Sequence, residues 1–249
     1  MTIPDDIGTA TAPPTSAKPA SLWEDFVDIF VSPSEVFERR RASGFLAPLL
    51  VFAIVTVVIT LAGHNAMQPI FDSEFARGIA AAAKKNPGMN QQQIEGSRAF
   101  MEKLTPIFIG IGALIMPLVL GVILWLSGKI VGAKEDIGAA CMIAAYSLIP
   151  RLLDTLLRVV QAFVLDPSML NGQYRVALSP ARFLDPDTAS PVLVALLGRI
   201  DLFTIWVTVL LAIGLAVVAR IPRSRAAIAA VVVWIIGSLP ALFGALRAS

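Results

Sequence analysis

The sequence has very little of what covalent cross-linking and most catalytic sites require. Its 249 residues include one cysteine, Cys141, and one histidine, His64. A lone cysteine excludes an intramolecular disulfide and a cysteine-built zinc site. A Ser–His or Cys–His catalytic pair would have to use His64, and the patterns GxSxG and HExxH do not occur. We therefore predict a protein that is not an enzyme and that needs no cofactor or metal.

Charged side chains are also scarce. They make up 15% of the residues, and 56% are hydrophobic, whereas soluble domains average about 25% charged and about 45–50% apolar residues. This balance is typical of an integral membrane protein. The net charge of +2 is small, so it does not indicate nucleic acid as a partner.

The residues before the first apolar run fall into two parts. Residues 1–21 are rich in Pro, Thr, Ala and Ser and lack apolar periodicity, so we predict a disordered cytoplasmic tail. Residues 22–44 show helical periodicity and predict amphipathic helices. Ser32 and Glu35 have the spacing of a capping box, with Pro33 at the first helical position. We expect these helices either to lie in the membrane interface or to pack on the cytoplasmic end of the bundle.

Five apolar runs are long enough for transmembrane helices, which need about 20 residues. They cover about residues 45–62, 106–126, 137–165, 202–219 and 226–246. We predict an all-α integral membrane protein in which residues 45–246 form a five-span helical bundle. Residues 63–105 and 166–201 are its two outer loops.

Basic residues in short segments set the predicted orientation, because such segments stay in the cytoplasm. One side of the membrane receives a group of them, namely Arg39, Arg40, Arg41, Lys129, Lys134, Arg220, Arg223 and Arg225. We expect this side and the N-terminus to be cytoplasmic, and the C-terminus to lie outside.

The first outer loop is predicted to be an outer helical hairpin. Asn90 and Gln93 have capping-box spacing at the start of its second helix. Within residues 67–104, apolar side chains fall on one face of each helix. This face either docks a partner or caps the outer end of the chain's own bundle. We favour the second, because such helices usually bury their apolar face internally.

Small residues at helical spacing predict where transmembrane helices pack closely, since lipid removes the hydrophobic drive between helices. The second run carries Gly110, Ala113, Pro117 and Gly121, and the fifth carries Gly237, Ala241 and Ala245. We expect both faces to be interior seams of the bundle.

The third run keeps charged side chains at membrane depth, where they are costly unless they are paired or line a polar cavity. Its polar residues share one helix face, and we name them the polar seam together with Asp201 from the start of the fourth run: Arg151, Asp154, Arg158, Gln161 and Asp201. The spacing puts Asp154 within reach of both arginines, and Asp201 is the nearest candidate to balance the second positive charge. The seam is either an ion-pair network that fixes helix register, which we favour, a face turned to water, or a site for an anionic lipid headgroup or a partner helix.

Three elements occur in a fixed order along the chain. They are Pro33 to Phe37 before the first run, the turn Gly132-Ala133-Lys134, and Ala145-Tyr146-Ser147-Leu148-Ile149-Pro150 inside the third run. In this order, over residues 22–246, the chain resembles the Yip domain family, which is named for membrane proteins that interact with Ypt/Rab-type GTPases. The Asp-Leu-Tyr-Gly-Pro motif of eukaryotic members is absent, which argues against GTPase binding here.

The long first outer loop is more similar to that of bacterial members. The resemblance therefore implies a protein of the bacterial cytoplasmic (inner) membrane that acts as a non-catalytic scaffold or accessory subunit. Its implied partners are membrane lipids, other membrane proteins such as an ABC-type export system, or further copies of itself.

Two other functions fit the sequence less well. A small-solute or lipid carrier or channel could use the polar seam, but the five runs show no clear inverted repeat and no matched pair of broken helices. An intramembrane hydrolase would need His64, which stands beside Gly63 at an outer span end. We interpret His64 as an interfacial polar residue that ends a helix.

Overall fold

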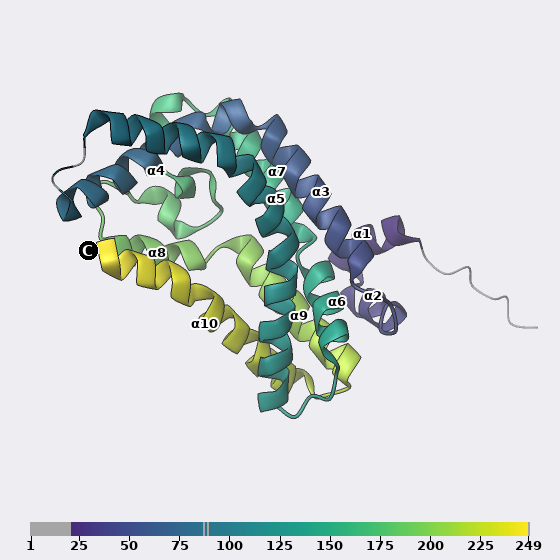
Figure 1. Cartoon of the computed structure of the whole chain (residues 1–249). Helices are drawn as coiled ribbons and strands as arrows, with labels where there is room; N and C mark the ends of the chain where they lie inside the picture. The colour runs from purple at the N-terminus through teal and green to yellow at the C-terminus, as the bar shows by residue number, and fades with distance from the viewer. Residues whose placement is uncertain (1–20, 87, 89, 249) are drawn as a thin grey trace, which may run out of the picture.

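The computed structural model describes residues 21–86, 88 and 90–248 (Figure 1). The predicted tail, residues 1–21, lies outside these residues except for Ser21. The elements, in chain order, are α1 (Leu22–Val31), α2 (Pro33–Arg39), α3 (Leu46–Ala62), α4 (His64–Lys85), α5 (Gln91–Ile130), α6 (Ile137–Ser147), α7 (Pro150–Val164), η1 (Pro167–Met169), η2 (Gln173–Val176), η3 (Pro180–Phe183), α8 (Pro191–Arg199), α9 (Leu202–Ala219) and α10 (Arg223–Ala248). Over the described ranges all regular structure is helical, as predicted.

The chain is a multi-pass membrane protein. In its described part, four helical segments are long and apolar enough to cross a membrane: α5, the α6–α7 segment, α9 and α10. A fifth span results if the bent pair α3–α4 counts as one. The 17 residues of α3 reach only about 25 Å, which is short for a hydrocarbon core of about 30 Å.

The amphipathic helices α1 and α2 pack against the bundle through one apolar face each. Ile29 of α1 and Val36 and Phe37 of α2 have no exposed surface, and α2 lies against α9. On the other side of α1, Trp23 is 72% exposed and Val27 is also exposed. The pair therefore packs beside α6 and α9 and still presents apolar side chains outward, as an interfacial helix does.

The capping box of this region forms one helix earlier than predicted. The Ser21 hydroxyl accepts from the Glu24 amide at 3.3 Å, and the Glu24 carboxylate accepts from the Ser21 amide at 2.5 Å. Ser32 makes no side-chain cap hydrogen bond. It already ends α1, with its amide donating to the Asp28 carbonyl at 2.7 Å, so the predicted box at Ser32 is wrong.

The chain bends sharply between α3 and α4, by 83°. The bend lies at Gly63, where a Cβ would come within 2.5 Å of the Val159 side chain on α7. The predicted box at Asn90 and Gln93 then starts α5. Because α5 continues for 40 residues through Pro106, the second hairpin helix and the second span are one helix rather than two.

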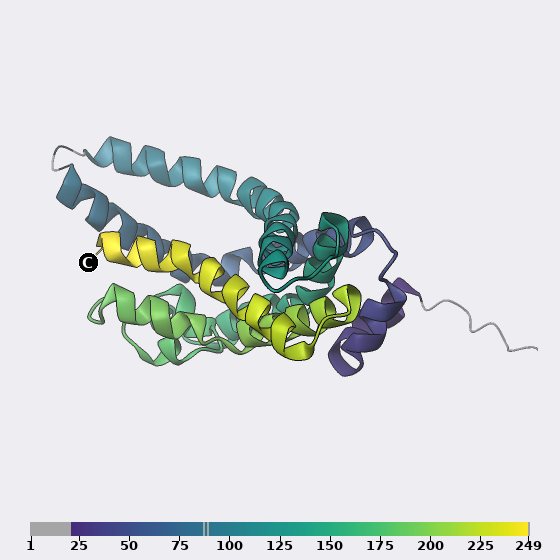
Figure 2. The same cartoon turned by 90° about the horizontal axis from the view of Figure 1, so that it is seen from below.

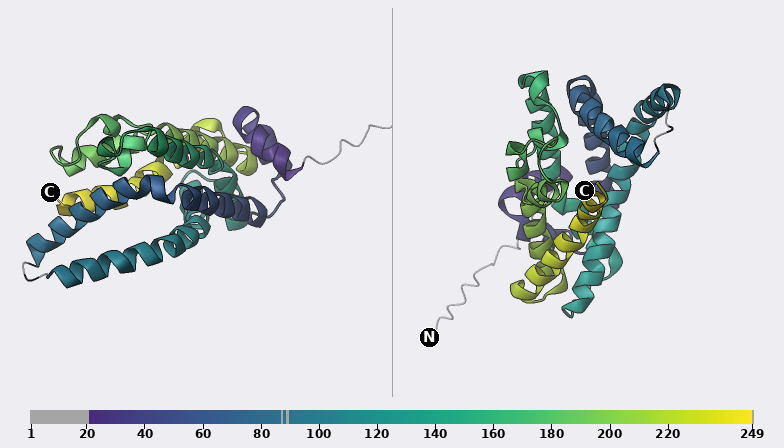
Figure 3. Two further views of the ribbon diagram at one scale, coloured as in Figure 1. Left: turned by 90° about the horizontal axis from the view of Figure 1, so that it is seen from above. Right: turned by 90° about the vertical axis from the view of Figure 1, so that its left-hand side faces the viewer.

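The outer hairpin projects from the bundle, and its two helices behave differently. Figures 2 and 3 show α4 and the N-terminal half of α5 extending to the same side of the molecule as α8 and the C-terminal half of α10. Ile70 of α4 packs with Ala162 and Leu170, so α4 covers the end of the bundle at which α7 ends. Phe100 and Met101 of α5 are exposed, so this face of α5 is not covered by the described part of the chain.

The centre of the bundle is α6. Every residue from Ala140 to Pro150 is buried, among α1, α3, α5 and α9. Pro150 supplies no amide hydrogen, and the amides of Ile149, Arg151 and Leu152 bond to carbonyls three residues back, which is a tighter 3₁₀ turn. The third predicted span is therefore two helices in one 28-residue apolar segment.

The small-residue face of α5 packs inside the bundle as expected. Ala113, Pro117 and Gly121 are buried. A Cβ at Gly121 would lie 2.7 Å from the Cα of Cys141 on α6, whereas Gly110 is partly buried beside α3. The close approach of α5 and α6 therefore requires glycine at position 121.

The small-residue face of α10 does not form an interior seam within the described chain. Gly237 and Ala241 are exposed and Ala245 is partly buried. This half of α10 packs on α8, and Arg199 of α8 reaches across to Ser238 at 2.9 Å. Helix α8 and its arginine occupy the place that a neighbouring span would need.

Candidate functional site

The polar seam starts on α7, whose helical spacing places three charged residues on one face. Asp154 accepts from Arg151 Nη1 at 2.7 Å and from Arg158 Nε at 2.8 Å. Asp154 is buried, and both arginine side chains are partly buried. The predicted contact of one carboxylate with two guanidiniums is confirmed.

Asp201 completes the seam from the start of α9. It caps that helix by accepting from the amides of Phe203 and Thr204, each at 3.1 Å. Its two oxygens lie 3.7 Å from Arg151 Nη1 and from Arg158 Nη2. Two carboxylates and two guanidiniums thus form a closed group without net charge. Asp201 Oδ2 has no hydrogen bond within the described residues, so its contact with Arg158 is purely ionic.

Gln161, the last residue of the predicted seam, does not join this ionic group. Its amide nitrogen donates to the Val176 carbonyl at 2.9 Å, and its amide oxygen accepts from Arg182 at 3.1 Å. Arg158 also reaches the Gln173 carbonyl, at 3.4 Å. Gln161 therefore holds the outer loop of η2 and η3 against α7.

Arg199 lies near the seam and is absent from the sequence-based site. Burial, and then the charge of Arg151, lower the pKa of Arg199 below its ordinary value. With Arg199 included, the group carries one excess positive charge. Its position two residues before Asp201 is visible in the sequence, but its partner Ser238 is 39 residues away, which spacing cannot indicate.

The polar seam and Arg199 can act on a ligand through charge and hydrogen bonds. In the described ranges no group of three or more His, Cys, Asp or Glu side chains could hold a metal ion. The four charged side chains neutralise one another's charge, and their contacts join α7 to α9. The excess charge of Arg199 favours an anion over a cation nearby.

A second charged group surrounds Tyr146, which comes four residues before Pro150 in the sequence. The polar seam begins directly after Pro150. Asp25 of α1 has no exposed surface. It accepts from Arg39 Nη2 at 2.9 Å, from Arg40 Nε, and from the Tyr146 hydroxyl at 3.3 Å. We name these four residues the Asp25 cluster. Sequence spacing did not indicate this cluster, because Arg39 and Arg40 are 14 and 15 residues from Asp25.

The residues named from the family resemblance have structural roles in the bundle. They begin a helix, pack between helices or allow a particular backbone conformation. Pro33 begins α2, and the buried Phe37 lies where a Cβ at Gly214 would come within 3.1 Å of it. Gly132 has φ 81° in the turn after α5, a conformation that favours glycine. Pro150 makes the break between α6 and α7.

The sequence pattern of the Yip1 domain matches residues 27–244. This range runs from within α1 to within α10, so it covers all the elements between them. Neither a curated protein nor a solved structure matches the chain significantly. The predicted resemblance is confirmed, and the chain belongs to the Yip1 domain family.

Proposed function

We propose that this protein is a non-catalytic scaffold or accessory subunit of a membrane protein complex. The observation that carries the proposal is the closed pairing of the polar seam, in which Asp154 and Asp201 each contact both Arg151 and Arg158. The resemblance to bacterial family members suggests an ABC-type export system as the partner. It also suggests the bacterial cytoplasmic membrane as the location.

The seam suits a fixed structure better than a moving one. A carrier has to release charged side chains from one another in each cycle, and removing one partner of a buried ion pair costs about 3–5 kcal/mol. Here such a release would also free Arg151 from Thr204, to which it donates at 3.0 Å. The seam therefore supports a rigid outer end on which a partner protein can assemble.

The proposed orientation has the N-terminus in the cytoplasm and the C-terminus outside. Figure 1 places the end of α5 and the α9–α10 turn together at one end of the molecule, and the C-terminus away from them. Lys129, Lys134 and Arg223 belong to the segments at that end, as expected for a cytoplasmic surface.

The test is purification in mild detergent, with identification of the proteins and lipids that co-purify. We expect a stoichiometric transporter subunit with the wild-type protein, and reduced recovery of it with Arg158→Leu, because Asp201 then loses one of its two ionic partners. Lys103→Leu, which changes an exposed positive charge on α5, is the matched control and should recover the partner fully. Arg158→Lys should restore part of the recovery if charge alone is needed.

Other outcomes separate the alternatives. Unchanged partner and lipid recovery with Arg158→Leu would overturn the role of the seam in assembly. Solute flux in proteoliposomes that the same variant abolishes would support a carrier instead. Gel filtration of each variant shows whether the protein remains folded.

A further inference from the structure

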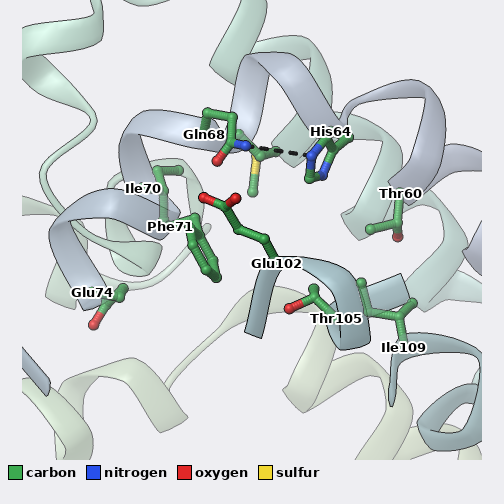
Figure 4. Close-up of a pocket in the computed structure, with 10 residues that line it drawn as sticks. Thr60, His64, Gln68, Ile70, Phe71, Glu74, Glu102, Thr105 and Ile109 are labelled. Atoms are coloured by element: carbon green, nitrogen blue, oxygen red, sulfur yellow. Dashed lines mark hydrogen bonds between the residues drawn. The ribbon is translucent and has the colours of Figure 1, made fainter. Parts of the chain in front are cut away.

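A cavity separate from the polar seam lies at the bend between α3 and α4, with α5 on its far side (Figure 4). Its volume is about 260 Å³, larger than the cavity of about 150 Å³ that suffices to bind benzene. Met67, Ile70, Phe71 and Ile109 supply apolar walls. The space is therefore suited to an apolar group such as part of a hydrocarbon chain.

Hydrogen-bond acceptors meet at one side of this cavity. Figure 4 shows the Glu102 carboxylate pointing between Gln68 and Phe71 into the cavity. The Gln68 amide nitrogen lies 3.4 Å from His64 Nε2. The Gln68 amide oxygen is buried and has no hydrogen bond within the described residues. Because that oxygen is covered, the acceptor that a ligand in the cavity can reach is the Glu102 carboxylate, whose side chain is 39% exposed.

The charges around the cavity select for a cation. Two arginines are each shared between two carboxylates, Arg98 between Asp72 at 2.5 Å and Glu102 at 3.0 Å, and Arg77 between Glu74 at 3.1 Å and Asp187 at 3.0 Å. Four carboxylates against two guanidiniums leave an excess of two negative charges. This excess attracts a protonated amine and disfavours a ligand with a net negative charge.

The position of the cavity fits a ligand that is apolar at one end and charged at the other. Because α4 leaves α3 at 83°, α4 runs nearly along the membrane surface when α3 crosses the membrane. The cavity at this bend then lies at the boundary between hydrocarbon and water. A chain can enter it from the lipid while its charged end stays beside Glu102.

We propose that this cavity binds a membrane lipid whose headgroup carries a protonated primary amine. The amine donates to the Glu102 carboxylate, and the start of an acyl chain lies against Phe71 and Ile109. The site shares no residue with the polar seam and does not depend on the proposed function.

Photo-crosslinking tests the proposal. A twelve-carbon alkylamine and the matching carboxylic acid, each with a diazirine in the chain, are applied to the full-length protein in phosphatidylcholine nanodiscs. We expect the amine to label peptides that contain Phe71 or Ile109 at about tenfold lower concentration than the acid, which corresponds to about 1.4 kcal/mol. Equal labelling by the two probes would overturn the proposal.

Two variants localise the binding. Glu102→Gln should weaken labelling by the amine about tenfold, and it keeps Arg98 anchored through Asp72. Glu95→Gln removes the same charge from the same helix outside the cavity and should leave labelling unchanged. Thr105→Trp, which fills the cavity, should abolish labelling by both probes, and unchanged affinity in Glu102→Gln would refute the role of that carboxylate.

Competition identifies the source of the amine. Phosphatidylethanolamine added to the nanodiscs should reduce labelling in proportion to its share, because its primary amine can donate hydrogen bonds. The quaternary amine of phosphatidylcholine has no such donor. If the alkylamine labels the cavity and phosphatidylethanolamine does not compete, the occupant is a free amphiphile and the assignment to a membrane lipid is overturned.

Discussion

Replacing Asp25 with asparagine should loosen α1 and α2 from the bundle without unfolding the rest. Asp25 supplies the negative charge to which Arg39, Arg40 and the Tyr146 hydroxyl all donate, and none of its surface is exposed. Asparagine preserves the size but removes the charge, and it offers one acceptor oxygen instead of two. The effect should be local, because Asp25, Arg39 and Arg40 all belong to the N-terminal segment of α1 and α2, and Tyr146 is the member of the cluster that belongs to α6.

The expected loss follows from the exposure of the two arginines. Removing one partner of a fully buried ion pair costs about 3–5 kcal/mol, and a hydrogen bond to a charged group contributes about 1.5–3 kcal/mol. Arg39 and Arg40 are 33% and 21% exposed, so water can partly replace the carboxylate. Arg39 also keeps Asp28 at 2.6 Å. We therefore expect a loss of about 2–3 kcal/mol, within the lower of the two ranges.

Hydrogen exchange of peptides from residues 22–40 measures this loss as a free energy of local opening. A loss of about 2–3 kcal/mol speeds exchange roughly 30- to 140-fold, since about 1.4 kcal/mol is a factor of ten. Asp28→Asn is the control, because Asp28 is 32% exposed and such a pair contributes at most about 1 kcal/mol. Wild-type protection in Asp25→Asn, or equal exchange in the two variants, would refute the reasoning.

Two further substitutions test packing and charge elsewhere. Gly121→Ala puts a Cβ 2.7 Å from the Cα of Cys141, so we expect thermal unfolding to show a loss of stability of about 1–3 kcal/mol. A Cβ at Gly112 meets no atom within 4 Å, so the control Gly112→Ala should gain up to about 1 kcal/mol of stability. Two losses of equal size would contradict this reasoning. Burial raises the pKa of Glu135 above 4.5, so its contribution to stability is fully present below pH 4.5 and is lost as pH rises through the raised pKa. Glu135→Gln should therefore stabilise the protein at about pH 8 and change little at about pH 4, and an equal change at both pH values would count against it.

Sequence patterns predicted contacts within one helix better than contacts between helices. The pairing of Asp154 with both arginines follows from helical spacing alone. The small-residue faces of α5 and α10 give the same sequence signal, yet Gly121 is buried against α6 and Gly237 is exposed. The difference arises because α8 packs beside the second half of α10. A spacing rule identifies a surface that permits close packing, but the path of the chain decides what lies against it.

The Asp25 cluster shows a second limit of sequence patterns. The helical periodicity of residues 22–44 predicts amphipathic helices, but it does not predict that Asp25 is buried. The tight turn between α1 and α2 then folds Arg39 and Arg40 back onto Asp25, across 14 and 15 residues of sequence. This reversal and the Tyr146 hydroxyl together offset the cost of burying the carboxylate. The same reversal leaves Ser32 as the end of α1 instead of the cap of α2.

Pro150 joins the Asp25 cluster and the polar seam into one structural unit. A proline weakens the hydrogen-bond ladder of a helix, and broken helices of this kind can serve as bending points. Here Tyr146, just before the break, is held by Asp25, and Arg151, just after it, is held next to Asp201. A bend at Pro150 would have to break the hydrogen bond of Tyr146 to the buried Asp25 or the contact of Arg151 with the buried Asp201, and either loss is costly. These contacts oppose bending at the α6–α7 junction, so they favour the proposed scaffold over a carrier, which would have to break them in each cycle.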